Sequence, residues 1–305
     1  MKAIVVTDEA AGTAGMTLTE RPMPEPGTND VLVEVRASGF TPGELTWPGT
    51  WTDRLGRDRT PSIPGHEVAG VVRALGYGTR GLSVGQRVFG LADWTRDGTL
   101  AEYVAVEARN LAPLPGDIED TIAASLPVSG LTAWQGLFVH GRFEAGQSVL
   151  VHGAAGGVGS LAVQLAHEAG AHVIGTGRSA DRETASALGA HEFLDLDVDA
   201  IADVGAVDLV FDVIGGEIGK QSAAVVRAGG MLVTIAGPPE VQPEDGWSVD
   251  FVVEADRAQL VEIAQRVRDG RLRTILGAVV SLEDAVAAFD SGERARGKTI
   301  VRVGS

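Results

Sequence analysis

The sequence has 305 residues and contains no cysteine. Disulfide bonds, thiolate nucleophiles and cysteine-ligated zinc sites are therefore excluded. Positive charge is also scarce, because lysine occurs only at positions 2, 220 and 298 and the formal net charge at pH 7 is −16. We expect a chain this acidic to bind neither nucleic acid nor an anionic membrane surface.

The chain also lacks a long apolar run. No stretch is long enough to span a membrane, and the charged residues within 2–9 do not resemble a signal peptide. We therefore expect a cytoplasmic protein without a membrane partner. The length suggests two domains, and a hydrophobic fraction of 44% is ample for a core in each of them.

The segment 148–176 has the pattern strand, glycine turn, helix, strand. A glycine turn between a strand and a helix lets backbone N–H groups approach a pyrophosphate, and the helix N-terminus adds partial positive charge. Within a complete β-turn-α-β unit this is a strong signal for a dinucleotide, although a tight turn without a ligand is the alternative. The predicted cofactor-binding residues of the turn are Ala155, Gly156, Gly157 and Val158.

The residues after the second strand indicate which nicotinamide cofactor binds. NAD-binding folds usually place Asp or Glu there to hold the ribose 2′-hydroxyl. This chain has Gly177, Arg178 and Ser179, and Asp181 comes later. Arg178 can bind a 2′-phosphate, Ser179 can donate a hydrogen bond, and Arg182 is a candidate second cation. NADPH is therefore favoured over NADH, unless Arg178 is only a solvated loop arginine.

Strand patterns without intervening helices fill the first third of the chain. The predicted strands lie at 2–7, 30–37, 67–75, 86–90 and 99–106. Clusters of turn residues separate them. This pattern predicts a partly closed β-domain rather than βαβ units.

From residue 119 the pattern changes to strands that alternate with helices. The predicted helices lie at 120–126, 130–139, 181–188 and 219–226, and the predicted strands begin at 149 and cover 172–176, 192–194, 207–213 and 231–236. This alternation predicts a doubly wound parallel sheet. An amphipathic helix at 255–269 leaves this domain. A last strand at 299–303 is expected to rejoin the first domain. The predicted domains are therefore 1–122 with 255–305, and 123–254.

Several short motifs occur in an order and spacing typical of one family. They are PGHEVAG at 64–70, VGQRV at 84–88, GTLAEYV at 98–104, LTAW at 131–134, AAGGVG at 154–159 and GK at 297–298. Together they resemble the medium-chain dehydrogenase/reductase superfamily, and within it the zinc-free quinone oxidoreductase group. The resemblance implies an α/β protein with a GroES-like, partly closed β-barrel catalytic domain and a Rossmann NADP-binding domain. It also implies nicotinamide in the cleft between the domains, and a homodimer paired through Rossmann edge strands.

The resemblance also bears on zinc. Zinc-dependent members place a Cys where this chain has Thr41, and a His in the segment that contains His66. His66 and Glu67 alone do not close a catalytic zinc site, and the four-cysteine structural lobe is missing. We therefore expect no metal. Quinone reductases often carry Asn-Pro-x-Asp where this chain has Thr-Pro-Gly-Glu at 41–44, so Thr41 replaces the hydrogen-bonding Asn and Glu44 replaces the Asp.

Further cofactor residues follow from the same resemblance. Thr132 matches a position close to the nicotinamide, and Phe251 and Val252 match the segment that covers its face. Lys298 is expected to reach the cofactor or only to hold the returning chain. Three more residues follow later Rossmann strands, where ligands bind at the carboxyl ends: Ile214, Ala236 and Gly237.

Aromatic residues are the candidates for the substrate pocket. Trp47 and Trp51 lie in a Pro/Gly loop that the resemblance puts at the cleft, where an indole can stack on a flat ring. Trp94 and Phe40 are further candidates. Ordinary packing against the β-domain is the alternative for these side chains.

Reduction of a conjugated carbonyl suits a site without a metal, because the substrate's own carbonyl is the electron sink. We therefore predict direct hydride transfer from NADPH to a quinone or a conjugated enone. The proton comes from solvent or from a weak acid, for which Glu44 and Glu67 are candidates, and Thr41 is a further catalytic candidate as a hydrogen-bond donor. One alternative is an enoyl-thioester reductase that acts on acyl-CoA or a carrier-bound substrate. The other is a non-enzymatic NADPH-binding redox sensor or structural protein.

Overall fold

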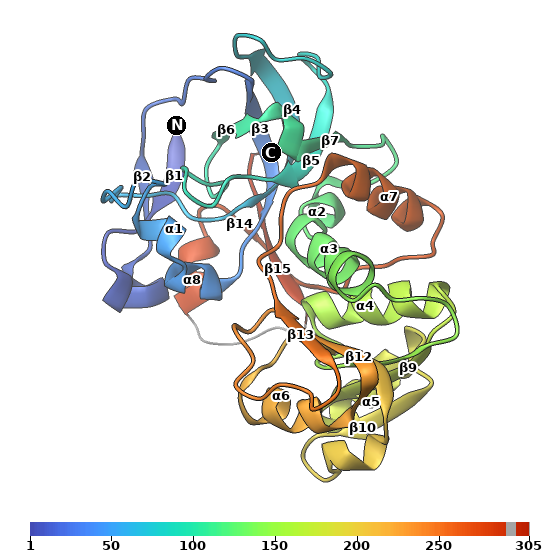
Figure 1. Ribbon diagram of the computed structural model, residues 1–305. Coiled ribbons are helices and arrows are strands. Elements are labelled where there is room, and N and C mark those ends of the chain that lie inside the picture. The colour runs from blue at the N-terminus through green and yellow to red at the C-terminus, as the bar shows by residue number, and fades with distance from the viewer. Residues whose placement is uncertain (291–296, 305) are drawn as a thin grey trace. The chain divides into compact units, whose positions relative to one another are not determined.

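The structure, a computed structural model, describes residues 1–290 and 297–304 (Figure 1). By its internal contacts the chain divides into two compact units. The first comprises Met1–Val128, Ala255–Arg268 and Leu276–Ser305, and the second comprises Ser129–Glu254 and Asp269–Ile275. The sequence assigned all of 255–305 to one domain, whereas Asp269–Ile275 packs with the second unit. There Arg271 forms an ion pair with Glu168, and Gln164 Nε2 donates to the carbonyl oxygen of Arg273 at 2.9 Å.

The first unit is built on β-strands. They are β1 (Lys2–Val5), β2 (Thr17–Glu20), β3 (Asp30–Gly39), β4 (Glu67–Leu75), β5 (Arg87–Leu91), β6 (Tyr103–Glu107), β7 (Leu111–Pro113), β14 (Leu276–Ser281) and β15 (Lys298–Arg302). Seven of them form one sheet in the order β14-β15-β3-β4-β5-β7, with β6 also paired to β3. Ile300 of β15 lies opposite Gly39 of β3, which confirms that the last strand rejoins this unit. Among the described strands the sheet does not close into a barrel.

Short helices connect these strands. They are η1 (Glu9–Gly15), η2 (Pro42–Thr46), α1 (Pro48–Trp51), η3 (Ala108–Asn110), α2 (Asp120–Ala123), α7 (Arg257–Arg268) and α8 (Ala285–Asp290), with α3 (Pro127–Trp134) leading into the second unit. The predicted amphipathic helix at 255–269 is therefore confirmed as α7. Among the described residues, no helix has both the length and the apolar character needed to cross a membrane.

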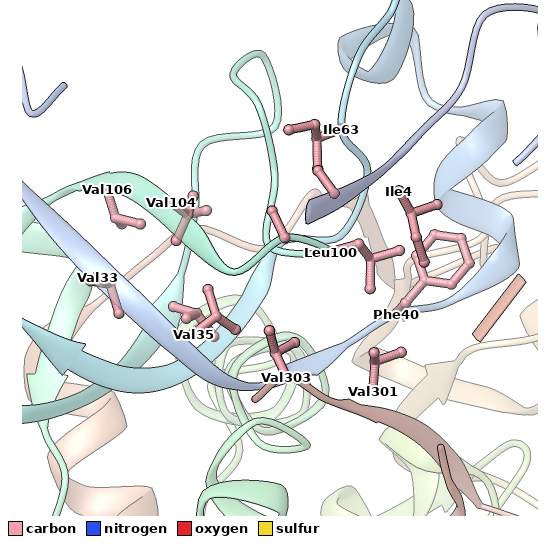
Figure 2. Close-up of a cluster of buried hydrophobic side chains, with 14 of the residues drawn as sticks. Ile4, Val33, Val35, Phe40, Ile63, Leu100, Val104, Val106, Val301 and Val303 are labelled. Carbon is pink, nitrogen blue, oxygen red and sulfur yellow. The ribbon is translucent and has the colours of Figure 1, made fainter. Parts of the chain in front are cut away.

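The core of the first unit lies against β3. Val33 and Val35 are 0% and 1% exposed. Glu34 lies between them and Arg36 follows, and both point to the other face of the strand. This alternation is the period of two that the sequence showed. Figure 2 shows these valines packed among side chains from segments distant in the sequence, including Ile4, Leu100, Val104 and Val301.

The second unit contains a six-stranded parallel sheet. Its strands are β8 (Ser148–Val151), β9 (His172–Gly177), β10 (Glu192–Asp195), β11 (Val207–Asp212), β12 (Val226–Thr234) and β13 (Trp247–Asp250), in the order β10-β9-β8-β11-β12-β13. The chain order reverses between β8 and β11, which confirms the predicted doubly wound sheet. The sequence did not predict β13. Its four residues, WSVD, are too few and too polar to show a strand pattern.

Helices cover both faces of this sheet. They are η4 (Gln135–His140), α4 (Gly157–Glu168), η5 (Ser179–Asp181), α5 (Arg182–Ala187), η6 (Ile201–Val204), α6 (Gly216–Ser222) and η7 (Ala223–Val225). Leu150, Ile174 and Val210 pack in one cluster with residues of η6 and η7. Gly175 points to the opposite face, where an added Cβ would lie 2.8 Å from the Cβ of Ala154. The inner strands β8, β9 and β11 are therefore buried on both sides, as parallel strands usually are.

Strand β12 begins earlier than predicted. It starts at Val226, where the sequence predicted the end of a helix, and it includes Gly229 and Gly230. Two adjacent glycines are typical of a turn. In the structure Gly229 adopts a φ of 76°, and the pairing of β11 with β12 shifts its register there, so the strand continues through the irregularity.

Candidate functional site

The glycine turn between β8 and α4 has the form of an anion cradle. An added Cβ at Gly159 would lie 2.1 Å from the carbonyl oxygen of Gly153, so the turn closes only with glycine there. Gly156 precedes the twelve-residue helix α4 and supplies no side chain to cap it. Gly156 and Gly157 are exposed. The first N–H groups of α4 therefore lack a side-chain cap, which fits a pyrophosphate.

The predicted cofactor residues on other strands come to the same edge of the sheet as this turn. The parallel strands β8, β11, β12 and β13 are neighbours, and their carboxyl ends lie side by side. Ile214 follows β11, Ala236 and Gly237 follow β12, and Phe251 and Val252 follow β13. Ile214 and Val252 are 45% and 75% exposed, so apolar surface is present at this edge.

Thr132 and Phe251 both belong to the second unit. Thr132 lies in α3 and is 3% exposed. The ring of Phe251 packs 4.4 Å, centroid to centroid, from the ring of His140. The assignment of both residues to the cofactor stays a prediction.

The loop after β9 carries the predicted 2′-phosphate residues. Arg178 is exposed, and its guanidinium has no polar partner within 1–290 and 297–304. The carboxylate of Asp181 accepts the backbone N–H of Arg178 at 3.1 Å, which holds the loop. Arg182 is engaged elsewhere, because it donates to the carbonyl oxygen of Phe193 at 3.0 Å and lies over that ring. Arg178 is thus the cation of this loop that remains available to a ligand.

Ser179 also has a partner that the sequence did not indicate. Its hydroxyl donates to the carboxylate of Asp195, the last residue of β10. A phosphate would therefore have to compete with the Asp195 carboxylate for the hydroxyl proton of Ser179. The only signal in the sequence was an acidic residue at the end of the predicted strand 192–194.

The first unit holds a buried group of titratable side chains. Glu67 is 0% exposed and Lys298 is 8% exposed, and the two form an ion pair. Glu67 Oε1 also accepts the backbone N–H of Val128 at 2.9 Å. Both of its oxygens are therefore engaged. This supports a structural role for Glu67 and for Lys298, whose reach to the cofactor stays a prediction.

Glu44 and His66 form a second buried pair. Glu44 Oε1 accepts the backbone N–H of Thr41 at 2.9 Å, and Glu44 Oε2 lies 3.7 Å from His66 Nε2. That distance is too long for a hydrogen bond. Both side chains are 1% exposed, and within the described chain neither Glu44 Oε2 nor either ring nitrogen of His66 has a hydrogen-bond partner.

Burial keeps this pair uncharged at neutral pH. It raises the pKa of Glu44 to about 8, and the negative charge of Glu67 acts in the same direction. Burial also lowers the pKa of His66 to about 3, with the positive charge of Arg59 as a further cause. At pH 7 Glu44 therefore carries a proton and His66 does not. The sequence singled out both residues, and it gave no sign that the acid would be neutral.

Two of the predicted pocket tryptophans gather over His66. The rings of Trp47 and Trp94 meet edge to face with centroids 4.8 Å apart, and the ring of His66 lies 6.1 Å and 4.7 Å from them. Both indoles are half-buried. They present a partly open aromatic surface within the first unit.

The other two pocket candidates lie in the core. Phe40 is 2% exposed and packs edge to face on Phe289 at 4.6 Å. Trp51 packs against the same core, and its indole N–H donates to the carbonyl oxygen of Leu45 at 2.8 Å. Their contacts are those of packing residues, and contact with a substrate stays a prediction for both.

His152 is a hydrogen-bonded core residue. The Ser222 hydroxyl donates to the carbonyl oxygen of Ile218 at 2.6 Å, so His152 Nε2 donates to Ser222 at 2.7 Å. The Thr176 hydroxyl then donates to His152 Nδ1 at 2.9 Å. This chain of hydrogen bonds joins the residue between β8 and the glycine turn to β9 and α6.

Comparison with known proteins covers both units. Residues 27–116 match the family model of the alcohol dehydrogenase GroES-like domain, and residues 157–264 match that of zinc-binding dehydrogenases. The chain is 32% identical over 300 residues to the 2-methylene-furan-3-one reductase of Solanum lycopersicum, across 92% of this chain and 73% of the relative. It is 32% identical over 271 residues to the chloroplastic NADPH-dependent alkenal/one oxidoreductase of Arabidopsis thaliana, across 83% of this chain and 66% of the relative. The solved quinone oxidoreductase from Coxiella burnetii superposes with a TM-score of 0.92 at 26% identity, across 100% of this chain and 99% of the other.

Proposed function

Because the chain belongs to the medium-chain dehydrogenase/reductase superfamily, in its quinone oxidoreductase group, we propose that it reduces quinones or conjugated enones with NADPH and without zinc. The observation that carries the proposal is the exposed glycine turn at the N-terminus of α4, with Arg178 directly after the neighbouring strand β9 and its guanidinium without a polar partner in the part of the chain that the structure describes. The chain resembles reductases of furanones and alkenals as well as quinone oxidoreductases. These relatives support an oxidoreductase of this type.

Several residues of the second unit fit a dinucleotide. The cofactor, when bound, supplies the hydride. The N–H groups that open α4 would hold its pyrophosphate, because Gly156 leaves them without a side-chain cap. The guanidinium of Arg178 would hold a 2′-phosphate, since it is exposed and has no polar partner in the described chain. These contacts favour NADPH.

Glu44 is the acid that the geometry supports best. Hydride addition to a conjugated carbonyl leaves negative charge on the substrate oxygen, and a proton must then be supplied. Glu67 is committed to Lys298 and Val128, whereas Glu44 holds a proton at neutral pH. Glu44 Oε2 lies 3.7 Å from His66 Nε2, and the His66 ring packs against the Trp47–Trp94 pair, so this acid lies close to the aromatic surface that would face a substrate.

The donor set of this cluster supports chemistry without zinc. Catalytic zinc in proteins is held by thiolate, imidazole and ionised carboxylate ligands. The chain has no cysteine, and a neutral Thr41 hydroxyl stands where the family places one. His66 and Glu44 remain, and two side chains do not close a catalytic zinc site.

A thioester substrate receives less support. An acyl-CoA or a carrier-bound substrate would need an available basic patch, for which Arg54, Arg57 and Arg59 are the local candidates. All three are paired with carboxylates: Arg54 with Asp93, Arg57 with Asp53 and Arg59 with Asp97. This cluster therefore offers little uncompensated positive charge to a phosphate.

The test is steady-state NADPH oxidation with a panel of quinones and α,β-unsaturated ketones. NADH in place of NADPH and an added chelator are the controls. Turnover that prefers NADPH and is insensitive to chelator is the expected result. Turnover that chelator abolishes would overturn the proposal of zinc-free chemistry, and cofactor binding without any turnover would favour the non-enzymatic redox sensor.

A further inference from the structure

Asp195 lies directly beside the loop that selects the cofactor. Strands β9 and β10 are parallel, and Asp195 pairs in register with Gly177. The backbone N–H of Leu196 donates to the carbonyl oxygen of Gly177 at 2.9 Å, so the pairing continues to the ends of both strands. Asp195 is therefore level with the start of the Arg178–Ser179 loop, although it is far from that loop in the sequence. Its side chain is 4% exposed.

The bond between Ser179 and Asp195 sets what Ser179 can offer a ligand. A serine hydroxyl has one proton to donate, and here it goes to the Asp195 carboxylate. The other oxygen of Asp195 accepts the backbone N–H of Asp197 at 3.1 Å. The Ser179 bond is the largest cause that lowers the pKa of Asp195, so this carboxylate is ionised at neutral pH. Ser179 thus presents only lone pairs outward.

A ribose hydroxyl and a ribose phosphate respond to this arrangement differently. A 2′-hydroxyl can donate its proton to Ser179 Oγ, which continues a line of donors that ends on Asp195. An ionised 2′-phosphate has no proton for that bond, and it meets a carboxylate one hydrogen bond behind the serine. The Ser179–Asp195 pair would therefore bind the ribose 2′-hydroxyl, as the acidic residue after the second strand does in NAD-binding folds.

We propose that Asp195 is a positioning residue that acts through Ser179 to favour NADH, and that it opposes the preference of Arg178 for NADPH. The chain then binds both cofactors, with a selectivity set by the balance of the two residues. This inference rests on the proposed assignment of the loop to a nicotinamide cofactor. It goes beyond that assignment because it proposes that Asp195, at the end of β10, limits the selectivity for NADPH.

The expected effect follows from the charges. Two unit charges about 6 Å apart in a high-dielectric surround repel enough to change a dissociation constant about threefold, and a doubly charged phosphate raises this to about tenfold. Asn at position 195 keeps an oxygen to accept from Ser179 but removes the charge. Asp195→Asn is therefore expected to tighten NADPH binding about five- to tenfold and to leave NADH binding within about twofold.

The experiment measures binding rather than turnover. The fluorescence of the reduced nicotinamide is titrated with the full-length protein to give dissociation constants for NADPH and NADH. Asp197→Asn is the matched control, because Asp197 is exposed, lies two residues away and loses the same charge. Ser179→Ala is the second variant, expected to weaken NADH about fivefold and to leave NADPH within about twofold. Arg178→Ala is expected to weaken NADPH at least tenfold.

The outcomes separate this inference from the proposed function. An unchanged ratio of the two dissociation constants in Asp195→Asn overturns the inference, as does an equal shift in Asp197→Asn or a loss of NADPH binding in Ser179→Ala. If the wild-type protein binds neither nucleotide, the cofactor assignment and the inference both fall. If the ratio shifts as expected but no quinone or enone is reduced, the inference stands and the proposed reductase activity alone is overturned.

Discussion

The buried ion pair between Glu67 and Lys298 is expected to be essential for the stability of the first unit. The Lys298→Met variant removes the cation and leaves a carboxylate that is 0% exposed without its countercharge. Breaking one side of a buried pair costs about 3–5 kcal/mol. For a unit of this size such a loss lowers the midpoint of thermal unfolding by roughly 10 °C.

The double variant Glu67→Gln with Lys298→Met is the control. Gln keeps an oxygen for the backbone N–H of Val128, so most of the lost stability should return once no unpaired charge is buried. Thermal unfolding followed by far-UV circular dichroism on the three proteins measures this directly. A Lys298→Met midpoint within about 2 °C of wild type, which corresponds to less than about 1 kcal/mol, would refute the reasoning. So would a double variant that is less stable than the single one.

Three further predictions concern pH and assembly. Because burial raises the pKa of Glu44 to about 8, kcat should fall as the pH rises through that value, and Glu44→Gln should be slow at every pH, which a pH-rate profile checks. Burial lowers the pKa of His152 from 6.5 to about 4, so its contribution to stability is present above pH 6.5 and is lost as the pH falls toward 4, by up to about 3 kcal/mol. The test compares the unfolding midpoints of wild type and His152→Gln between pH 6.5 and 4. A variant that loses as much stability on acidification as wild type would contradict the prediction. Trp247 is 69% exposed on the edge strand β13, and we expect a homodimer through that edge; light scattering should then show a dimer for wild type and a monomer for Trp247→Glu.

Many secondary-structure elements of this protein were predictable because each shows a local sequence pattern. The glycine turn was predictable because Gly159 has no room for a side chain and because the flanking strand and helix each show their own period. The alternation of Val33 and Val35 with polar neighbours marked a strand with one buried face. Strand β13 and the early start of β12 were missed, since a short polar strand and a pair of glycines carry no such period.

The residues of the candidate site were predictable from the sequence, but their interaction partners were not. The sequence singled out Arg178, Ser179, Glu44 and His66 one by one. It gave no sign that Ser179 donates to Asp195 or that Glu44 stays protonated. Both facts depend on which groups surround a side chain, and residues distant in the sequence supply those groups.

The sequence by itself determined the order of the elements, the doubly wound sheet and the position of the dinucleotide turn, because each depends on the chemistry of consecutive residues. Tertiary structure alone decided which charges meet. Strand register sets Asp195 level with Gly177, and the return of β15 beside β3 brings Lys298 to Glu67. Those pairings, made once the sheets form, determine which buried charge is compensated and what the cofactor loop can offer a ligand.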